Sequence, residues 1–331
     1  AIFGRPATVS WKKPSNWTKR RRDVELDERA ATTQQEGQVQ THVGKKPKSR
    51  KKARGASVSG KGKTRKKRRV GPISTDLHRL YEDAVQSPGE HIKFFDRVYE
   101  LANGRLPKSL KEDFCGTALM STEWVRTRTD NVAVGVDLDE PTLEWALANN
   151  VSTLDLEQRR RLTLHHKDVR KVHEPKVDIV AALNFSYFEF KTRDELRGYL
   201  ENARRSLNPG GLLILDMFGG WEAQMEVTDR TRNAGYTYAW EQTKFDPVTH
   251  ITQFHIHFKF HGGGGLHKAF EYNWRLWSIP EVRELLEEAG FGSVQVYWEE
   301  IDPDTDEGSG EFVLVTEAEN IPGWIAMLVA S

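Results

Sequence analysis

A short stretch, Glu112-Asp113-Phe114-Cys115-Gly116-Thr117-Ala118, sets the architecture of this 331-residue chain, together with the apolar run Val132-Ala133-Val134-Gly135-Val136 that leads into Asp137. Gly116 lets backbone N–H groups at the start of a helix approach a ligand, because it has no side chain in the way. Asp137 follows Gly116 by 21 residues. In nucleotide-binding βαβ units, an acidic residue about 20 positions after the glycine turn binds ribose hydroxyls. The two stretches therefore predict a Rossmann-like unit for a ligand that contains a nucleoside.

In these stretches the sequence resembles the class I S-adenosylmethionine-dependent methyltransferases. The first motif of that family usually reads acid-x-Gly-x-Gly-x-Gly, and its second strand ends in an acidic residue. Matched by position, Glu112 is the leading acid, while Phe114 and Ala118 stand where the family has glycines. A donor with one adenosine and no pyrophosphate requires less open backbone than a dinucleotide, so the missing glycines count more against NAD than against S-adenosylmethionine.

The resemblance implies S-adenosylmethionine as the cofactor. The residues that it places at the cofactor site are Glu112, Cys115, Gly116, Thr117, Asp137, Leu138, Asp168, Val169, Asn184 and Ser186.

A repeating β-then-α pattern runs through residues 75–331 and predicts an α/β fold. We expect helices over 192–207, opened by a capping box of Thr192 and Glu195, and over 279–289, ended by Gly290. The class is a Rossmann-like, seven-stranded, mostly parallel sheet flanked by helices. The expected strands are 106–114, 132–136, 162–166, 177–183, 212–218, 293–298 and 324–330, with a turn at Asn208-Pro209-Gly210-Gly211 before the fifth.

Between Tyr236 and Trp277 the hydrophobic period changes from that of the βα units to strict alternation. Three antiparallel strands around the glycines at 262–265 are expected there, as a β insertion over the substrate cleft. The segment 302–308 is either a loop that closes over that cleft or a solvated hairpin tip.

The residues after the fourth strand are the expected catalytic residues, Asn184 and Tyr187, with Ser186 between them. Ligands of open α/β sheets bind at the carboxyl ends of the strands. A sulfonium methyl group is already activated, so the enzyme has mainly to hold a nucleophile in line with the S–CH₃ bond. Asn184-Phe185-Ser186-Tyr187 is similar to the Asn-Pro-Pro-Tyr of amino-methylating nucleic-acid enzymes, without the prolines. The alternative is a generic role in the floor of the cofactor site.

Cys115 is the only cysteine, so the chain has no internal disulfide and a reducing compartment is expected. We expect Cys115 to pack beneath the cofactor rather than to act as a nucleophile. Histidines 255, 257 and 261 share one face of a regular strand, yet three residues on a twisted strand rarely converge on one ion, and no metal is predicted. No apolar run reaches the length of a membrane span, so no membrane partner is expected.

Charge divides the chain into two parts, residues 1–71 and residues 72–331. The first part holds 22 Lys and Arg against five Asp and Glu, and the second holds 27 against 43, although the net charge is only +1. With few large apolar residues, the first part cannot bury a core and is expected to be disordered when free. Such a segment binds phosphate backbones by counterion release. The expected nucleic-acid contacts are Lys45, Lys46, Lys48, Arg50, Lys51, Lys52, Arg54, Lys63, Arg65, Lys66, Lys67, Arg68 and Arg69.

Trp11 and Trp17 lie among further basic residues of this extension. They either stack on bases or pack on the catalytic domain, since aromatic residues in such extensions serve both uses.

Three functions remain open from the sequence. The first is a methyltransferase that its basic extension delivers to RNA, with ribosomal RNA and ribosomal proteins as partners. The second is a catalytically weak or inactive methyltransferase-like factor for the assembly or structure of a mitochondrial ribosome. The third is a small-molecule or protein methyltransferase, which the acidic second part favours because it repels RNA. A basic, acid-poor beginning suits import into an organelle, so a mitochondrial location is expected, with the plastid and the nucleolus as alternatives.

Overall fold

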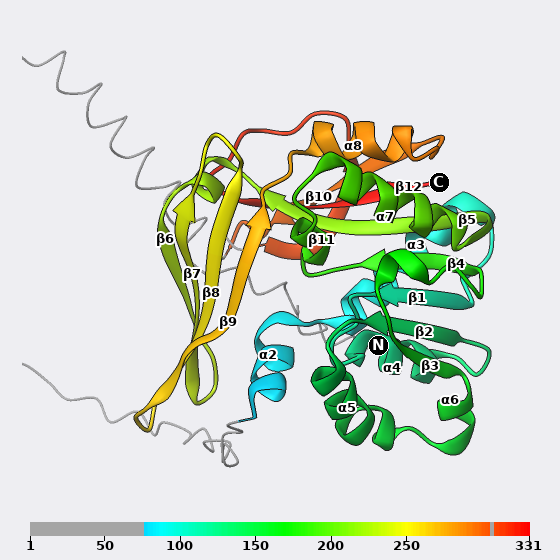
Figure 1. Ribbon diagram of the computed structural model, residues 1–331, viewed down its shortest axis with the longest axis horizontal. Coiled ribbons are helices and arrows are strands. Elements are labelled where there is room, and N and C mark those ends of the chain that lie inside the picture. The colour runs from blue at the N-terminus through cyan, green and yellow to red at the C-terminus, as the bar shows by residue number, and fades with distance from the viewer. Residues whose placement is uncertain (1–75, 305–307) are drawn as a thin grey trace, which may run out of the picture.

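The computed structural model describes residues 76–304 and 308–331 (Figure 1). The basic extension, with Trp11, Trp17 and all the expected nucleic-acid contacts from Lys45 to Arg69, therefore lies outside the described residues.

A large sheet and a small sheet make up the described part, and helices flank the large one (Figure 1). The large sheet has the strand order β11-β10-β12-β5-β4-β1-β2-β3. Its strands are β1 (Ser109–Asp113), β2 (Val132–Asp137), β3 (Leu162–His166), β4 (Val177–Ala182), β5 (Leu207–Gly219), β10 (Val294–Ile301), β11 (Gly308–Val315) and β12 (Trp324–Ala330). Strands β1 to β5 are parallel, β12 pairs antiparallel with β5, and β10 pairs antiparallel with β12, so β10 runs in the direction of β1 to β5. The prediction of a mostly parallel α/β sheet is confirmed.

Strand β11 adds an eighth strand to the seven predicted. It pairs antiparallel with β10, with Gly308 opposite Ile301. Residues 305–307, between these two strands, lie outside the described residues, so both interpretations of the segment 302–308 stay predictions. The sequence concealed β11 because Gly308-Ser309-Gly310 has the composition of a loop.

The α-helices are α2 (Leu77–Val85), α3 (Pro88–Asn103), α4 (Leu119–Thr127), α5 (Glu140–Asn149), α6 (Leu156–Arg160), α7 (Arg193–Arg205) and α8 (Ile279–Glu288). The capping box of Thr192 and Glu195 opens α7 as expected. The 3₁₀ turns are η1 (Val151–Thr153), η2 (Val169–Lys171), η3 (Ser186–Glu189) and η4 (Trp221–Gln224). All six residues of β4 are buried, so elements cover both faces of the sheet at its centre.

The expected turn at residues 208–211 lies inside β5 rather than before it. Val177 of β4 is opposite Leu207, and Ile179 is opposite Leu212, so β5 carries extra residues at this point. Gly210 takes a φ of +76°, which suits a glycine. The residues that read as a turn therefore form an irregularity within a continuous strand.

The small sheet contains four antiparallel strands, β6 (Val227–Arg232), β7 (Tyr236–Phe245), β8 (Ile251–Phe260) and β9 (Gly265–Arg275). The insertion therefore begins before residue 236. Strand β6 was missed because only Val227 among its buried residues is apolar, while Asp229 is buried as well.

Helix α2 lies between the small sheet and α5 (Figure 1). Leu80 and Ala84 of α2 pack with aromatic residues of the small sheet. On its other side, Arg79 donates to Asn149 and Asn150 at the end of α5 and lies 4.7 Å from the ring centre of Trp145. Helix α2 thus connects the β insertion to the first βαβ unit.

Candidate donor site

The loop between β1 and α4 has the backbone of a glycine-rich turn although it contains one glycine. Gly116 has a φ of +49°. Phe114 and Ala118 have φ values of +58° and +53°. These are the two positions where the family motif has glycines, and the left-handed region is uncommon for residues with a side chain. The loop therefore keeps the left-handed backbone that glycines usually adopt, at a cost in conformational strain.

Asp137 meets Gly116 at the end of β2, as their spacing predicts. Its Oδ2 accepts a hydrogen bond from the Gly116 N–H at 2.7 Å, and its Oδ1 accepts from the Asp139 N–H at 2.9 Å. Each carboxylate oxygen has a further lone pair, so Asp137 can still accept ribose hydroxyls. The next residue, Leu138, is 65 % exposed and offers an apolar side chain that a flat base can cover.

Glu112 points to the opposite side of β1 from its neighbour Asp113. Its Oε2 accepts from the N–H and the hydroxyl of Ser121 in the first turn of α4. Burial raises the pKa of Glu112 to about 8. Asp113, in contrast, is paired with the buried ammonium of Lys111 at 2.6 Å and accepts from Tyr199. Glu112 is thus a buried acid with no basic partner among the described residues.

A cavity of about 10 Å³, the space of one water molecule, lies beside Glu112. Two of its lining residues carry a buried oxygen without a hydrogen-bond donor, Gln86 Oε1 and Asn184 Oδ1. Acceptors of this kind favour a ligand that donates several hydrogen bonds and carries positive charge, and the α-ammonium group of S-adenosylmethionine has both properties. The residues at this edge therefore fit the predicted donor. The lining consists of Gln86, Ser87, Pro88, His91, Glu112, Met120, Leu183 and Asn184.

The loop after β4 brings Asn184 to this cavity, but it places Tyr187 elsewhere. Tyr187 is fully buried, and its ring packs 5.0 Å from that of Phe188. Burial raises the pKa of its hydroxyl well above the ordinary value. Ser186 donates its hydroxyl to the Leu183 carbonyl. The catalytic roles of Asn184 and Tyr187 stay predictions, and of the two only Asn184 lines the cavity.

Asp168 and Val169 form the start of η2. Asp168 accepts from the Arg170 N–H and pairs with the Arg170 guanidinium at 2.7 Å, which lowers the pKa of Asp168. Val169 is buried. This pair is separate from the cavity, after the end of β3, and β2 lies between β3 and β1 in the sheet.

Cys115 and Thr117 support the loop from inside. Cys115 is 1 % exposed and packs with Ala118, Leu143 and Ala146. Burial, helped by nearby carboxylates, raises the pKa of the thiol well above its usual value, so it does not suit a nucleophile. The Thr117 carbonyl accepts from the Asn150 side chain.

The histidines of the small sheet are arranged differently from the expectation. His255 and His257 both approach Glu241, but His261 contacts Thr237, and the third ring near His257 is that of His267, at 4.5 Å. The Lys268 N–H donates to Nδ1 of His257, so the ring proton lies on Nε2 and points to Glu241. No group of three side chains in residues 76–304 and 308–331 is arranged to hold a metal ion. Within the same residues, no helix is long and apolar enough to cross a membrane.

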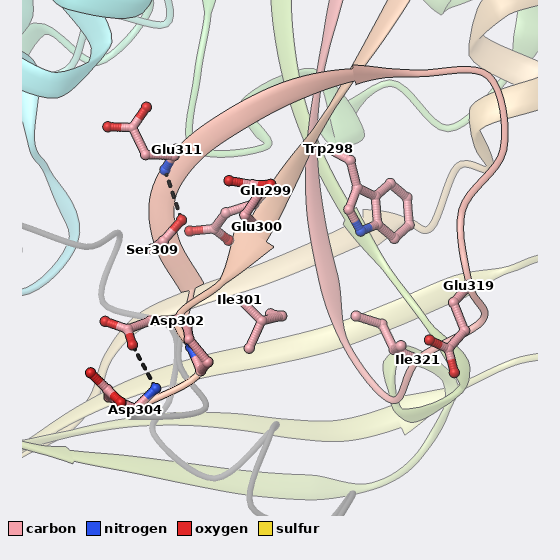
Figure 2. Close-up of a pocket in the computed structure, with 11 residues that line it drawn as sticks. Trp298, Glu299, Glu300, Ile301, Asp302, Asp304, Ser309, Glu311, Glu319 and Ile321 are labelled. Carbon is pink, nitrogen blue, oxygen red and sulfur yellow. Dashed lines mark hydrogen bonds between the residues drawn. The ribbon is translucent and has the colours of Figure 1, made fainter.

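A hollow beside the end of β10 shares no lining residue with the cavity beside Glu112. It has a volume of about 650 Å³ and lies between the β10–β11 hairpin and residues 319–321 (Figure 2). Trp298 and Ile321 form part of an apolar wall. The acidic side chains around it are Glu299, Glu300, Asp302, Asp304, Glu311 and Glu319.

Residues 113–215, which include the β1 loop and the strands up to β5, match the family model described as "Methyltransferase domain". This part of the chain is therefore similar to a methyltransferase domain. It has the Rossmann-like fold of the S-adenosylmethionine-dependent class, whose methyl donor is the cofactor predicted from the motifs. A search of curated proteins by sequence finds no match.

Solved structures that are similar to this chain have the same fold. An S-adenosylmethionine-dependent methyltransferase from Clostridium acetobutylicum is 15 % identical with a TM-score of 0.53, over 76 % of this chain and 96 % of that one. The CcbJ methyltransferase from Streptomyces caelestis is 18 % identical with a TM-score of 0.54, over 75 % and 98 %. CalS10 with bound S-adenosylmethionine, an amino pentose methyltransferase from Micromonospora echinaspora, is 16 % identical with a TM-score of 0.54, over 79 % and 100 %.

Two residues were not found from the sequence: Gln86, which lines the cavity, and Asp216, whose carboxylate accepts from the Asn184 and Phe185 N–H groups. Gln86 follows α2, outside the matched domain, and Asp216 lies within the apolar run of β5. The one available signal was the presence of an acid in a strand that is otherwise buried and apolar, because such a carboxylate requires a partner.

Proposed function

We propose that this chain is an S-adenosylmethionine-dependent methyltransferase that acts on RNA, to which its basic extension delivers it. The observation that carries the donor half of the proposal is the cavity of unpaired acceptors beside Glu112, at the edge where Asp137 and Gly116 meet. The acceptor half rests on the charge of residues 1–71.

Different residues at the carboxyl ends of the strands bind different parts of the donor. Asp137 accepts the ribose hydroxyls, and Leu138 covers one face of the base. Glu112, Gln86 and Asn184 accept from the ammonium group. Bound S-adenosylmethionine supplies an activated methyl group, so what remains for the protein is to orient the acceptor and exclude water.

The charge pattern supports the proposal of RNA as the substrate. The acidic hollow in Figure 2 repels a phosphate backbone, so RNA has to approach the donor site from another side. The 22 basic residues of the extension supply the attraction that the catalytic domain lacks. Ribosomal RNA with ribosomal proteins, in the mitochondrion, is the proposed setting, because a polycationic extension suits both organelle import and a ribonucleoprotein.

A second candidate is methylation of an amino group on a small molecule. It is favoured by solved structures of similar fold, among them CalS10, the amino pentose methyltransferase, and KedS8, a sugar N-methyltransferase that is 17 % identical with a TM-score of 0.52. This candidate leaves the basic extension without a function in catalysis.

Calorimetric titration of S-adenosylmethionine into the full chain tests the donor half. We expect micromolar binding that Asp137→Ala abolishes, because the substitution removes the carboxylate that accepts the ribose hydroxyls. Asp130→Ala is the matched control, since Asp130 is an exposed aspartate that pairs with Lys108 at the far end of β2. No binding by the folded wild-type chain would overturn the donor half and leave the inactive assembly factor as the better account.

Salt-dependent binding to a ribosomal RNA fragment tests the acceptor half. In the full chain, replacing Lys66, Lys67, Arg68 and Arg69 by Gln should flatten the slope of log K against log salt by about 0.7 for each phosphate that the chain no longer neutralises. The matched control replaces four exposed basic residues of the methyltransferase domain, Arg126, Arg160, Arg193 and Arg197. Equal slopes in wild type and the Lys66–Arg69 variant would exclude delivery by this cluster.

A further inference from the structure

A carboxylate at the centre of the sheet holds the loop that carries Asn184. Asp216, in β5, is fully buried. Its Oδ2 accepts from the Asn184 N–H at 2.7 Å, and its Oδ1 accepts from the Phe185 N–H at 2.8 Å. Both oxygens of one side chain are thus directed to two consecutive backbone groups just beyond the end of β4.

The loop requires such a partner because of its conformation. Asn184 and Phe185 have φ values of +58° and +59°, so two consecutive residues lie in the left-handed region. Asparagine tolerates this region, but a bulky residue such as phenylalanine rarely adopts it. The two N–H groups also point away from any strand partner, and buried N–H groups need an acceptor. The Asp216 carboxylate supplies both the acceptors and the constraint.

The consequence of this conformation is the position of the Asn184 side chain. Asn184 Oδ1 is buried without a donor and lines the cavity that Glu112 and Gln86 also line. Asn184, Glu112 and Gln86 come from three separate elements, the loop after β4, strand β1 and the end of α2. Only the Asn184 oxygen depends on a loop in an unfavourable conformation, so it is the part of the cavity that needs support.

The charges around this loop also favour a positively charged ligand in the cavity. Burial raises the pKa of Asp216 to about 7, although the hydrogen bonds from the N–H groups of Phe185 and Asn184 act to lower the pKa. None of the ion pairs in residues 76–304 and 308–331 involves Asp216 or Glu112. Two buried acids without a cation lie around one loop, and a positive charge in the neighbouring cavity would stabilise the ionised form of both.

We infer that Asp216 is a positioning residue for the methyl donor: its carboxylate holds the loop at Asn184 and Phe185 so that the Asn184 amide oxygen meets the donor's ammonium group beside Glu112 and Gln86. Asp216 acts through Asn184 and does not contact the donor. This inference rests on the proposed use of S-adenosylmethionine.

The test compares two ligands in calorimetric titrations of the full chain. S-adenosylmethionine carries the ammonium group, whereas 5′-methylthioadenosine has the same nucleoside without the amino-acid part. Asp216→Asn keeps the shape of the side chain but offers only one acceptor oxygen, so one of the two N–H groups loses its partner. We expect Asp216→Asn to weaken binding of S-adenosylmethionine about tenfold and to leave 5′-methylthioadenosine within about twofold of wild type.

A double-mutant cycle identifies the route. If Asp216 acts through Asn184, then Asp216→Asn causes no further loss of S-adenosylmethionine affinity in the Asn184→Ala background. Asp178→Asn is the matched control, because Asp178 is another buried aspartate that accepts a backbone N–H, from Lys108, at the opposite end of β4. It should lower stability without changing the ratio of the two affinities. Should Asp216→Asn not fold, Asp216→Glu, which keeps the charge but displaces the loop, is expected to give the same selective loss.

The outcomes separate the inference from the function on which it rests. A wild-type chain that binds neither ligand overturns the proposed function. A wild-type chain that binds both, with equal losses for both ligands in Asp216→Asn, makes Asp216 merely structural and overturns the inference. An Asp216→Asn variant that binds both ligands as tightly as wild type overturns the inference as well.

Discussion

Buried carboxylates have opposite surroundings at the two ends of the parallel strands. We call the side of the sheet where these strands begin the amino edge and the side where they end the carboxyl edge. At the amino edge, Asp178 accepts hydrogen bonds from Arg105, Tyr99, Asn208 and the Lys108 N–H. Burial alone would raise the pKa of Asp178, but these bonds outweigh it and hold the pKa at about 2. At the carboxyl edge, burial dominates, and the pKa values of Glu112 and Asp216 rise to about 8 and about 7.

This difference separates stability from function within one sheet. A fully hydrogen-bonded carboxylate stabilises the folded state, whereas a buried acid without a cation destabilises it until a ligand brings positive charge. Unfavourable groups concentrate at ligand sites for this reason. The carboxyl edge also contains the left-handed residues of the β1 loop and of the loop after β4, Phe114, Ala118, Asn184 and Phe185.

The largest expected effect is at the amino edge. Asp178→Ala removes the acceptor for four partners and should lower the free energy of unfolding by about 3 kcal/mol, because a guanidinium and a backbone N–H lose their partner. Denaturant titration measures this change. Asp130→Ala, which removes an exposed ion pair with Lys108, is the control and should stay within about 0.5 kcal/mol of wild type. A loss as small as that of the control would show that the two edges do not differ in this way.

A smaller effect of opposite sign is expected at Glu112. Its folded pKa of about 8 lies above its ordinary value of 4.5, so in that interval the folded state holds a proton that the unfolded state has lost. The contribution of Glu112 to the free energy of unfolding is therefore fully present below about pH 4.5 and is lost as the pH rises through about 8. Glu112→Gln removes this dependence and should stabilise the chain by about 1 to 3 kcal/mol at pH 8, while it weakens donor binding.

Denaturant titrations of Glu112→Gln and wild type at pH 5.5 and pH 8 provide the check. The difference in stability between the two proteins should grow with pH. A difference that is the same at both pH values would mean that Glu112 is ionised in the folded state throughout this range, so burial does not raise its pKa.

The smallest effect concerns strain in the β1 loop. Ala118 has a φ of +53°, and the Ala118→Gly change restores the glycine of the family motif. Relief of strain should offset the greater entropy of the unfolded chain and stabilise the protein by about 0.5 kcal/mol. Ala203→Gly, at a buried helical position in α7, should instead destabilise by about 1 kcal/mol. Thermal unfolding of both variants distinguishes them, and destabilisation by both would argue against strain at Ala118.

Much of the fold could be predicted because local patterns carry it. The strand at 162–166 and the helix opened by Thr192 were predicted correctly, since periodicity and capping boxes are properties of neighbouring residues. Strands β6 and β11 were missed because each contains polar residues or glycines that become strand only by pairing with a neighbour, β7 or β10. The candidate site could also be predicted only in part. The spacing of Gly116 and Asp137 identified these two residues, whereas Gln86 and Asp216 belong to no motif.

The sequence by itself determined the order of the five parallel strands, the class of ligand and the separation of charge between residues 1–71 and the rest, because these depend on spacing and composition along the chain. Only the tertiary structure decided which side chains share the donor edge. The end of α2, strand β1, the loop after β4 and strand β5 are distant in sequence, and they meet because a parallel sheet brings the carboxyl ends of its strands to one edge. Burial at that edge then set the pKa values and left the acceptors of Gln86 and Asn184 without donors, since desolvation depends on the whole surroundings of a group.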